Sequence, residues 1–549
     1  MIEPPRRIDG PHVPSLLPDA PDYSALRERF HWDVPHRFNI AVACCDAWAA
    51  IAPDRPCLLH DPLGSSDVLS YGELRVRSDA LAADMASRGI MRGDRVAILL
   101  PQGFEAAVAH MAIYKLGAIA LPLALLFGAE AISHRLLTSG ARAIVTGGEG
   151  LAKLSAITEP LPALEHVYSA DGASSDAIDL DAILARRDRF EAVDTAAGDP
   201  AMMIFTSGTT GPPKGALHAH RVLIGHVPGV QAHHMPLPLD GDVMWTPADW
   251  AWAGGLLNVL LPGLMLGVPV ISIPPAKFDP EAAFAVMAAG RVTRMFMPPT
   301  ALRLLATADA PKERLALRTI GSGGEQLGAA AHAWARETLG ITVNEFYGQT
   351  ECNLVLSGCA AMGVVDEHAI GRPVPGHEVA IIGPDGEALG NGEQGEIAVR
   401  RPDPVMFLEY WDRPDATRDK FRGDWMLTGD QGVRDEGGLF HFTGRDDDII
   451  TSAGFRIGPG EIEDCLNAHP DVSLSAAVGV PDPVRTEVVK AFVVLRSGVS
   501  ADEGAKQRLS DHVRHRLSAH EYPREIEFVD ELPLTVTGKV VRRELRDRR

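Results

Sequence analysis

The chain is 549 residues long and 46% of them are hydrophobic, so its length favours about three or four domains with well-filled cores. Its 52 basic and 73 acidic residues leave a formal charge of −21 at pH 7. This charge argues against general binding to nucleic acid or to an anionic membrane, so a negatively charged substrate would need local basic groups.

The six cysteines and the start of the chain narrow the class further. No Cys-x-x-Cys or His-Glu-x-x-His spacing occurs, which argues against a zinc site or a disulfide framework. The first residues, Met-Ile-Glu-Pro-Pro-Arg-Arg, lead into a proline-rich and charged arm without the apolar segment of a secretory signal. We therefore expect a cytoplasmic protein.

From about residue 70, the sequence alternates helical patterns with short apolar strands. Helices at 74–88 and 106–116 are each followed by a strand, at 95–100 and 118–122. Further strands are expected at 143–146, 202–205, 293–297 and 319–321. This alternation is typical of parallel sheets covered by helices, and ligands of such sheets bind where strands end in glycine-rich loops.

The stretch from Thr206 to Gly215, Thr-Ser-Gly-Thr-Thr-Gly-Pro-Pro-Lys-Gly, is the strongest functional signal. Its glycines allow close backbone approach, its hydroxyl groups are short donors, and Lys214 adds a positive charge. The spacing differs from the Walker A pattern, so a P-loop fold is not implied. A loop of this composition suits the phosphates of a nucleotide.

An uncharged stretch at 256–273 is long enough to be mistaken for a membrane span. Two prolines and two glycines interrupt it, which favours a buried helix, a turn and a strand at 268–273. We therefore expect no stable membrane insertion.

The last third of the chain changes in character. Pro-Asp-Gly at 384–386 and Asn-Gly at 391–392 indicate a small β-rich subdomain that begins at about Gly376. A charged turn at 444–448 then precedes a compact α+β pattern, with a helix at 460–468 and a strand at 491–495.

Four further motifs follow the glycine-rich loop: Tyr347-Gly348-Gln349-Thr350-Glu351, Thr428-Gly429-Asp430, Gly444-Arg445 and Gly538-Lys539. Each alone is an ordinary turn, but together, in this order, they resemble the AMP-forming acyl-CoA synthetases. These belong to the adenylating superfamily that includes adenylation domains and luciferases. The resemblance covers nearly the whole chain beyond residue 70 and looks closest to the medium-chain branch.

The resemblance implies an α/β fold in three parts. An N-terminal domain at 1–443 contains two helix-covered sheets and the β-rich subdomain at 376–443. A hinge at 444–448 connects it to a small, mobile α+β domain at 449–549.

The resemblance also assigns the residues of an ATP site. Phosphates would be held by Thr206, Ser207, Gly208, Thr209, Thr210, Gly211 and Lys214. The rest of ATP or AMP would contact Gly324, Glu325, Glu345, Phe346, Tyr347, Gly348, Gln349, Asp430, Arg445 and Arg456. Tyr347 would stack on adenine, and Asp430 would accept the ribose hydroxyls.

The catalytic residues implied are Thr350, Glu351 and Lys539. Glu351 would bind Mg²⁺, which would bridge phosphate oxygens. Lys539 would reach the α-phosphate and the substrate carboxylate, where its charge offsets the negative charge that develops.

Transfer of the acyl group to CoA requires the C-terminal domain to rotate about Asp447 in the family that this chain resembles. Ala453, Gly454 and Phe455 would line the pantetheine tunnel. Arg485 would contact a CoA phosphate.

The acyl pocket implied by the resemblance contains Trp252, Ala253, Gly254, Gly323 and Gly348. Small-acid specialists have a tryptophan in place of Gly348, so we expect a short- to medium-chain, branched or aromatic acid. No basic residue is obviously placed to pair with a second carboxylate. His218, His220 and Arg221 lie near the loop, on what reads as a helix face.

Lysine acetylation at Lys539 would remove the charge that adenylation needs, which makes a lysine acetyltransferase and deacetylase candidate partners. An alternative within the superfamily is an adenylation enzyme that loads a carrier protein. A nucleotide-binding regulator without catalysis is a second alternative, although Glu351, Asp430 and Lys539 are all present. Arg542 and Arg543 could suggest nucleic-acid binding, but the acidic residues between the arginines of this segment favour a solvated end.

Overall fold

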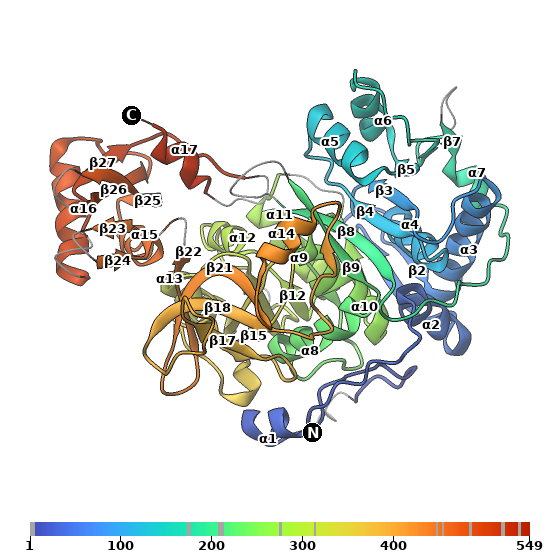
Figure 1. Ribbon diagram of the computed structural model, residues 1–549, viewed down its shortest axis with the longest axis horizontal. Helices are drawn as coiled ribbons and strands as arrows, with labels where there is room; N and C mark the ends of the chain where they lie inside the picture. Colours follow the sequence, from blue (N-terminus) through green and yellow to red (C-terminus); the bar gives the residue numbers. More distant parts are fainter. Residues whose placement is uncertain are drawn as a thin grey trace.

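The computed structural model describes residues 6–172, 177–206, 213–273, 277–311, 314–445, 448, 450–452, 455–482, 486–517, 522–535 and 540–548. Within these ranges, the side chains of Thr451, Phe455, Arg456, Glu461 and Thr486 are not described. Two large sheets form the body of the molecule, and a smaller α+β unit lies at one end (Figure 1).

The eight-stranded sheet is mostly parallel. Its order is β19 (Glu409–Tyr410), β9 (Lys214–Ala219), β8 (Pro200–Thr206), β4 (Ile119–Pro122), β3 (Arg95–Leu99), β5 (Ala143–Thr146), β6 (His166–Ser169) and β7 (Ile178–Asp179). Strand β9 pairs antiparallel with both β8 and β19. The glycine-rich loop therefore connects two antiparallel strands and does not lead from a strand into a helix.

The nine-stranded sheet is parallel in its centre and antiparallel at both edges. Its order is β16 (Arg372–Pro373), β15 (Leu356–Ser357), β14 (Val343–Tyr347), β13 (Thr319–Gly323), β12 (Arg294–Phe296), β10 (Met244–Trp245), β11 (Val270–Ser272), β1 (Pro56–His60) and β2 (Asp67–Ser70). The pairs β2–β1, β14–β15 and β15–β16 are the antiparallel ones.

Helices fill the space between the two sheets. This inner layer contains α3 (Tyr71–Ser87), α4 (Phe104–Lys115), α8 (Val222–His234), α9 (Ala253–Gly255), η2 (Leu256–Leu260) and α10 (Leu261–Leu266). A buried strand supplies side chains to this inner layer and to the outer layer in turn, because successive side chains of a strand point to opposite faces. On β3, Val96 and Ile98 join the inner core, whereas Ala97 and Leu99 join the outer one.

Two outer layers cover the other faces. The eight-stranded sheet is covered by α5 (Ala129–Ser139) and α6 (Gly148–Ser155), and the nine-stranded sheet by α11 (Pro280–Ala289), α12 (Pro299–Leu305) and α13 (Ala329–Trp334). Shorter helices are α1 (Tyr23–Arg29), η1 (Val42–Asp46), α2 (Ala47–Ile51), α7 (Leu180–Leu184), η3 (Ala335–Leu339), η4 (Ala360–Met362) and α14 (Pro414–Asp419).

A small antiparallel sheet follows the two large ones along the chain. It contains β17 (Val379–Ile382), β18 (Gln394–Arg400), β20 (Phe421–Arg422), β21 (Trp425–Arg434) and β22 (Phe440–Arg445). Gly386 and Gly392, in the two predicted turns, have φ angles of +86° and +80°, which glycine adopts without strain.

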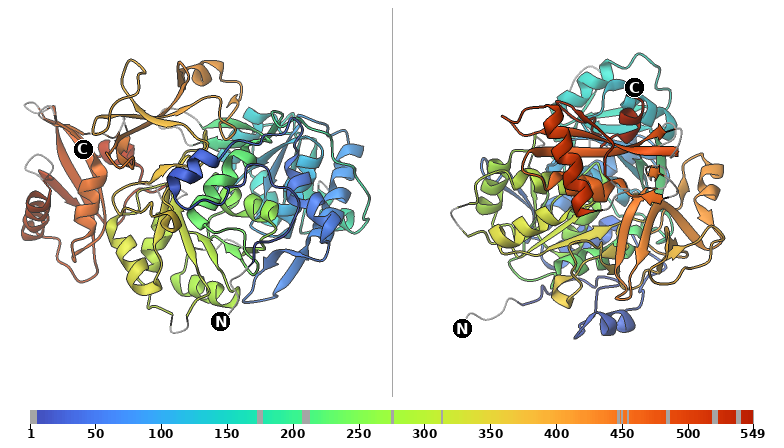
Figure 2. Two further views of the ribbon diagram at one scale, coloured as in Figure 1. Left: turned by 90° about the horizontal axis from the view of Figure 1, so that it is seen from below. Right: turned by 90° about the vertical axis from the view of Figure 1, so that its left-hand side faces the viewer.

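The terminal unit has its own sheet and core. Its strands are β23 (Ile450–Ser452), β24 (Phe455–Ile457), β25 (Val472–Asp482), β26 (Thr486–Leu495) and β27 (Glu525–Phe528), and its helices are α15 (Pro459–Asn467), α16 (Glu503–Arg516) and α17 (Arg542–Arg546). Figure 2 shows this unit, in red, set against one side of the molecule.

The predicted architecture is confirmed: two helix-covered sheets, a small β-rich sheet and a final α+β unit are all present. The uncharged stretch at 256–273 folds as η2 and α10, a left-handed turn at Gly267 and strand β11, as expected. Of the helices in the described ranges, none is both long and apolar enough to cross a membrane.

Candidate active site

The base of the glycine-rich loop lies where β8 ends and β9 begins. Thr206 and Lys214 are paired across these strands, and the Thr206 hydroxyl donates to the Lys214 carbonyl at 3.4 Å. The two ends of the loop are therefore held together by the sheet. Between them, the predicted phosphate-binding residues Ser207, Gly208, Thr209, Thr210 and Gly211 lie outside the described residues.

Tyr410 connects the base of this loop to Glu351. It lies on β19, opposite Ala216 of β9, and the Lys214 ammonium is 5.2 Å from the centre of its ring. The Tyr410 hydroxyl donates to Oε1 of the buried Glu351 carboxylate. Burial, and then the charge of Glu351, raise the pKa of Tyr410, so this hydroxyl keeps its proton.

Tyr410 was not predicted from the sequence. Its partner Glu351 is 59 positions earlier in the chain, and no spacing pattern links the two. The backbone strengthens the connection, because the Phe407 amide donates to the Glu351 carbonyl at 2.8 Å. The pairing of β19 with β9 places Tyr410 beside the loop, and this pairing could not be predicted from the sequence.

A second group of predicted residues meets around Asp430. Asp430 of β21 lies opposite Arg445 of β22, and the guanidinium Nη1 is 3.5 Å from its Oδ1. The Tyr347 hydroxyl donates to Asp430 Oδ2 at 2.5 Å. Burial and the neighbouring Asp430 charge raise the pKa of Tyr347 well above its usual range. The residues expected at adenine and ribose are thus direct neighbours.

Gln349 joins the same group through its side-chain amide. It donates to the Thr428 carbonyl at 3.0 Å, and it accepts a hydrogen bond from the Lys420 ammonium at 2.7 Å. The Thr428 hydroxyl in turn accepts from the Asp430 amide at 3.1 Å. Lys420 is a second cation near the site that the motifs do not reveal.

The predicted turn at Gly323 to Glu325 lies between the N-terminal body and the terminal unit. Gly324 has a φ of +101°, which requires glycine, and Glu325 pairs with Arg303 at 2.9 Å. The next residue, Gln326, donates to Asp464 of α15 at 3.1 Å. Helix α15 is therefore docked beside this turn.

Neighbouring residues of β14 face opposite sides of the sheet. Phe346 is buried in the inner core, where its ring stacks on His233 at 4.8 Å and lies 5.5 Å from the Phe296 ring. Glu345 accepts from the Leu327 amide at 3.4 Å and lies 3.4 Å from His332 Nε2. The side chain of Phe346 is thus directed away from Tyr347 and Asp430.

Two of the predicted acyl-pocket residues, Gly254 and Gly323, lie against the aromatic rings of Phe296 and Phe346. A side chain at Gly254 would meet the Phe296 ring at 2.9 Å, and one at Gly323 would meet the Phe346 ring at 2.6 Å. Ala253 follows Trp252, whose ring packs edge-on against Phe127 at 5.5 Å. Gly254 and Gly323 therefore lie beside the Phe296–Phe346 pair, whereas Trp252 packs against Phe127.

The structure shows why glycine is required at position 348, which the sequence does not. A Cβ atom there would lie only 0.9 Å from the carbonyl oxygen of Asn353. The close approach of these two backbone segments therefore requires glycine, whatever the size of the acid.

The helix-face interpretation of the histidines after the loop is wrong. His218 is on strand β9 and His220 directly follows it, and both side chains are buried. Burial lowers the pKa of His218 to about 3, although the nearby Thr350 backbone opposes this, and lowers that of His220 to about 4. Both imidazoles are therefore neutral near pH 7 and supply no positive charge for a second carboxylate.

Several predicted site residues cannot be placed. Asp447, Ala453, Gly454, Arg485 and Lys539 lie outside the described residues, as do the side chains of Phe455 and Arg456.

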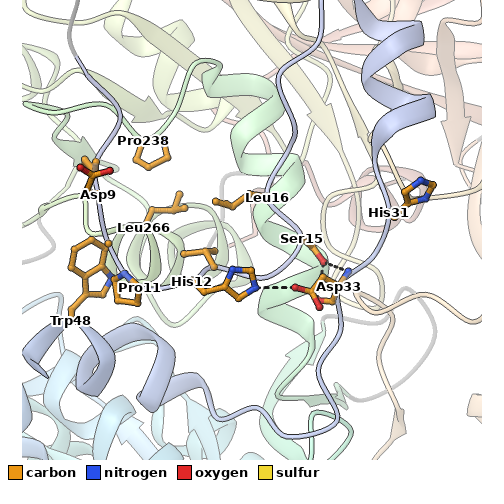
Figure 3. Close-up of a pocket in the computed structure, with 13 residues that line it drawn as sticks. Asp9, Pro11, His12, Ser15, Leu16, His31, Asp33, Trp48, Pro238 and Leu266 are labelled. Atoms are coloured by element: carbon orange, nitrogen blue, oxygen red, sulfur yellow. Dashed lines mark hydrogen bonds and ion pairs between the residues drawn. The ribbon is translucent and has the colours of Figure 1, made fainter. Parts of the chain in front are cut away.

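A cavity of about 480 Å³ lies elsewhere, under the N-terminal arm (Figure 3). Its lining includes Trp48, Leu266 and the pair formed by His12 and Asp33, which are 2.9 Å apart. None of the predicted site residues lines it, so it is separate from the candidate active site.

Comparison with known proteins assigns the family. The sequence profile of the AMP-binding enzyme family matches residues 45–411, and that of the AMP-binding enzyme C-terminal domain matches residues 461–539. The chain belongs to this family. The assignment to the AMP-forming acyl-CoA synthetases, made from the motifs, is confirmed.

The relatives extend over nearly the full length of the chain. The human mitochondrial acyl-coenzyme A synthetase ACSM2B is 34% identical, with 94% of this chain and 92% of the relative covered. An uncharacterized acyl-CoA ligase of Bacillus subtilis (strain 168), YtcI, is 31% identical, with 94% and 96% covered. The solved structure of the anthranilate CoA ligase AuaEII with anthranoyl-AMP has a TM-score of 0.85 at 25% identity, with 94% and 98% covered.

The buried histidines predict how stability depends on pH. Burial lowers the pKa of His110 and His218 to about 3 and that of His226 to about 4. Below about pH 6.5, the unfolded chain binds protons that the folded protein does not, so the free energy of unfolding falls with decreasing pH. Each such histidine contributes up to about 1.4 kcal/mol per pH unit between the unfolded pKa and its own folded pKa.

The variant His110→Leu, compared with the wild type by chemical denaturation at several pH values, isolates one such contribution. We expect its slope below pH 6 to be shallower by up to about 1.4 kcal/mol per pH unit. The exposed His12 provides a matched control, His12→Gln. An unchanged slope in His110→Leu would mean that this imidazole is protonated in the folded protein.

Proposed function

We propose that the chain is an acid:CoA ligase that forms AMP. It would convert a carboxylic acid and ATP into an acyl-adenylate and pyrophosphate, and would then transfer the acyl group to CoA. The observation that carries this proposal is the convergence of two groups: Lys214, Tyr410 and Glu351 at the loop, and Tyr347, Asp430 and Arg445 beside β21. Loading of a carrier protein is less favoured, because the relatives reported above are acyl-CoA ligases.

In the first half-reaction, the carboxylate attacks the α-phosphate while pyrophosphate leaves. Both reactants are anions, so the site must hold them in line and neutralise their charge. Lys214 and the loop residues from Thr206 to Gly211 would bind the leaving phosphates. Asp430 would accept the ribose hydroxyls, with Tyr347 against the base and Arg445 beside the ribose.

Glu351 would hold Mg²⁺, and Thr350, the residue before it, would act in catalysis. Glu351 fits this role because its Oε1 accepts the Tyr410 hydroxyl, whereas its Oε2 accepts no hydrogen bond from the described residues. Mg²⁺ at nucleotide sites commonly binds one or two carboxylates together with substrate phosphates. When bound, the ion would neutralise phosphate charge. Tyr410 would fix the orientation of the carboxylate.

The second half-reaction would require the terminal domain, 449–549, to rotate about the hinge at 444–448, with Asp447 as the hinge residue. Charged contacts support movement as one body. Arg542 of α17 donates to Glu463 of α15 at 2.7 Å and lies 3.3 Å from Asp448, directly after the hinge residue. The Val541 amide donates to the Pro533 carbonyl at 2.8 Å, which closes the base of the segment that contains Lys539.

After this rotation, the CoA thiol would approach through a tunnel lined by Ala453, Gly454 and Phe455. Arg456 and Arg485 would contact phosphate groups. The acid would be short- to medium-chain, branched or aromatic, because small residues and aromatic rings surround the predicted acyl pocket.

A panel of carboxylic acids tests the proposed reaction. Straight-chain acids from acetate to decanoate, branched acids and benzoates are each mixed with ATP, Mg²⁺ and CoA, and AMP, pyrophosphate and free thiol are measured. We expect equal release of AMP and pyrophosphate with loss of one thiol per turnover, for at least one acid longer than acetate. Activity confined to acetate would contradict the pocket assignment, and release of AMP without thiol loss would favour carrier loading.

Tyr410→Phe tests the orientation of Glu351. Loss of the hydroxyl leaves the carboxylate unsupported, so we expect the Mg²⁺ concentration for half-maximal adenylate formation to rise about 10- to 100-fold. Tyr168→Phe is the matched control, because Tyr168 also donates to a buried carboxylate, Asp84, at 3.2 Å but lies in the other part of the eight-stranded sheet. An unchanged Mg²⁺ requirement in Tyr410→Phe would remove Tyr410 from the site.

Lys539→Gln tests the predicted catalytic lysine and its control by acetylation. The substitution removes the positive charge as acetylation would, and we expect adenylate formation to fall at least about 100-fold. Lys506→Gln, at a partly exposed position of α16 in the terminal unit, is the control. Full adenylate formation by Lys539→Gln would exclude both the catalytic role and a switch operated by an acetyltransferase and deacetylase.

A further inference from the structure

His233, in the last turn of α8, has a fully buried side chain whose ring nitrogens make no good hydrogen bond with the described residues. Among the described residues, neither ring nitrogen has a hydrogen-bond partner in good geometry, although the Gly229 carbonyl, one helical turn earlier, makes a weak contact with the ring. The adjacent His234 is equally buried, but its Nδ1 lies 2.8 Å from the Thr319 hydroxyl. Leaving a buried polar group without a hydrogen bond is unfavourable, so a partner for His233 would be favoured.

The surrounding backbone accommodates this imidazole. A side chain at Gly321 of β13 would place its Cβ 2.5 Å from His233 Cδ2 and 2.9 Å from Nε2. Glycine is therefore required at the place where the ring edge meets the strand.

His233 is also next to the predicted acyl pocket. Its ring stacks on Phe346, with an interplanar angle of 19°, and Phe346 contacts Phe296 and the Gly323 position. Gly254, at the other end of this row, meets the Phe296 ring. One continuous row of rings therefore leads from the predicted pocket to the unpaired imidazole.

The imidazole is neutral at physiological pH. Burial lowers the pKa of His233 to about 3, although the Gly229 carbonyl, one helical turn earlier, opposes this in part. A neutral imidazole has one N–H donor and one nitrogen acceptor. It suits an uncharged hydroxyl or amino group. A second carboxylate would lose its hydration there without gaining a positive partner.

We propose that His233 is a specificity-determining residue at the far end of the acyl pocket, and that the preferred substrates are carboxylic acids with a neutral hydroxyl or amino group distant from the carboxylate. This inference rests on the proposed acid:CoA ligase function. It adds the chemical class of the acid, which neither the nucleotide-binding residues nor the family assignment supplies.

Matched pairs of acids test this proposal. Each hydroxybenzoate is compared with the methylbenzoate of the same ring position, and 6-hydroxyhexanoate with heptanoate, because a hydroxyl and a methyl group have similar size. For the best pair, we expect kcat/KM of the wild type to favour the hydroxyl acid at least about 10-fold, since a site built to hydrogen-bond a hydroxyl discriminates strongly.

Variants at position 233 separate hydrogen bonding from packing. His233→Phe keeps a flat ring against Phe346 and is expected to lose the preference, mainly through slower turnover of the hydroxyl acid. His233→Asn, which retains a donor and an acceptor, is expected to recover part of it. His234→Gln, which can still bond Thr319, is the neighbouring control and should keep the preference of the wild type.

The outcomes separate the two proposals. If no acid gives CoA-dependent AMP release, the proposed function fails. If acids are activated but the wild type favours the methyl partner in every pair, the role of His233 is wrong while the function stands, and this result needs no variant to fold. An equal preference in the wild type and in a folded His233→Phe would also overturn it.

Discussion

The contact on which the candidate site depends is that of Tyr410 with Lys214 on one side and Glu351 on the other. It is possible only because β19 returns to the eight-stranded sheet and pairs with β9, next to the base of the glycine-rich loop. The Glu351 motif comes from the end of the nine-stranded sheet. A single tyrosine thus links groups from two separate sheets. The cation and the carboxylate that a phosphate site needs are held at a defined separation.

The positive charge of the candidate site comes from a few nearby side chains and not from the protein as a whole. With a net charge of −21, the protein as a whole repels the anionic substrates proposed for it. Lys214, Lys420 and Arg445 supply positive charge near the site, and each lies near or pairs with a polar group that orients it. The buried histidines beneath the site do not add to this charge, because burial keeps them neutral. The positive charge on the nucleotide side therefore comes from these two lysines and the arginine, and not from the histidines.

Much of the fold followed from local patterns in the sequence. Buried strands such as β3 and β5 were predicted to within one residue of their observed ends. Both faces of such a strand must be apolar, so the strand stands out in the sequence as an apolar run. The antiparallel return of β9 was not predicted, since pairing direction depends on partners far away in the chain. For the same reason, His218 was assigned to a helix face.

The site residues also fall into two groups, those that motifs predict and those that only the structure reveals. Glu351, Tyr347, Asp430 and Arg445 belong to motifs that can be read along the chain, and the structure brings the last three into direct contact. Tyr410, Lys420 and His233 could not be found, because their importance arises only from contacts with distant residues. Gly348 was noted for the size of the acid that it admits. Its closest constraint is the Asn353 backbone, which no sequence pattern reports.

These residues would form a site where an acyl-adenylate is made before CoA takes part. Acid-dependent exchange of labelled pyrophosphate into ATP, measured with Mg²⁺ and without CoA, tests it most directly. We expect exchange that requires the acid and stops when pyrophosphate is removed by a pyrophosphatase. Exchange that is absent until CoA is added, with an acid that the complete reaction consumes, would contradict it.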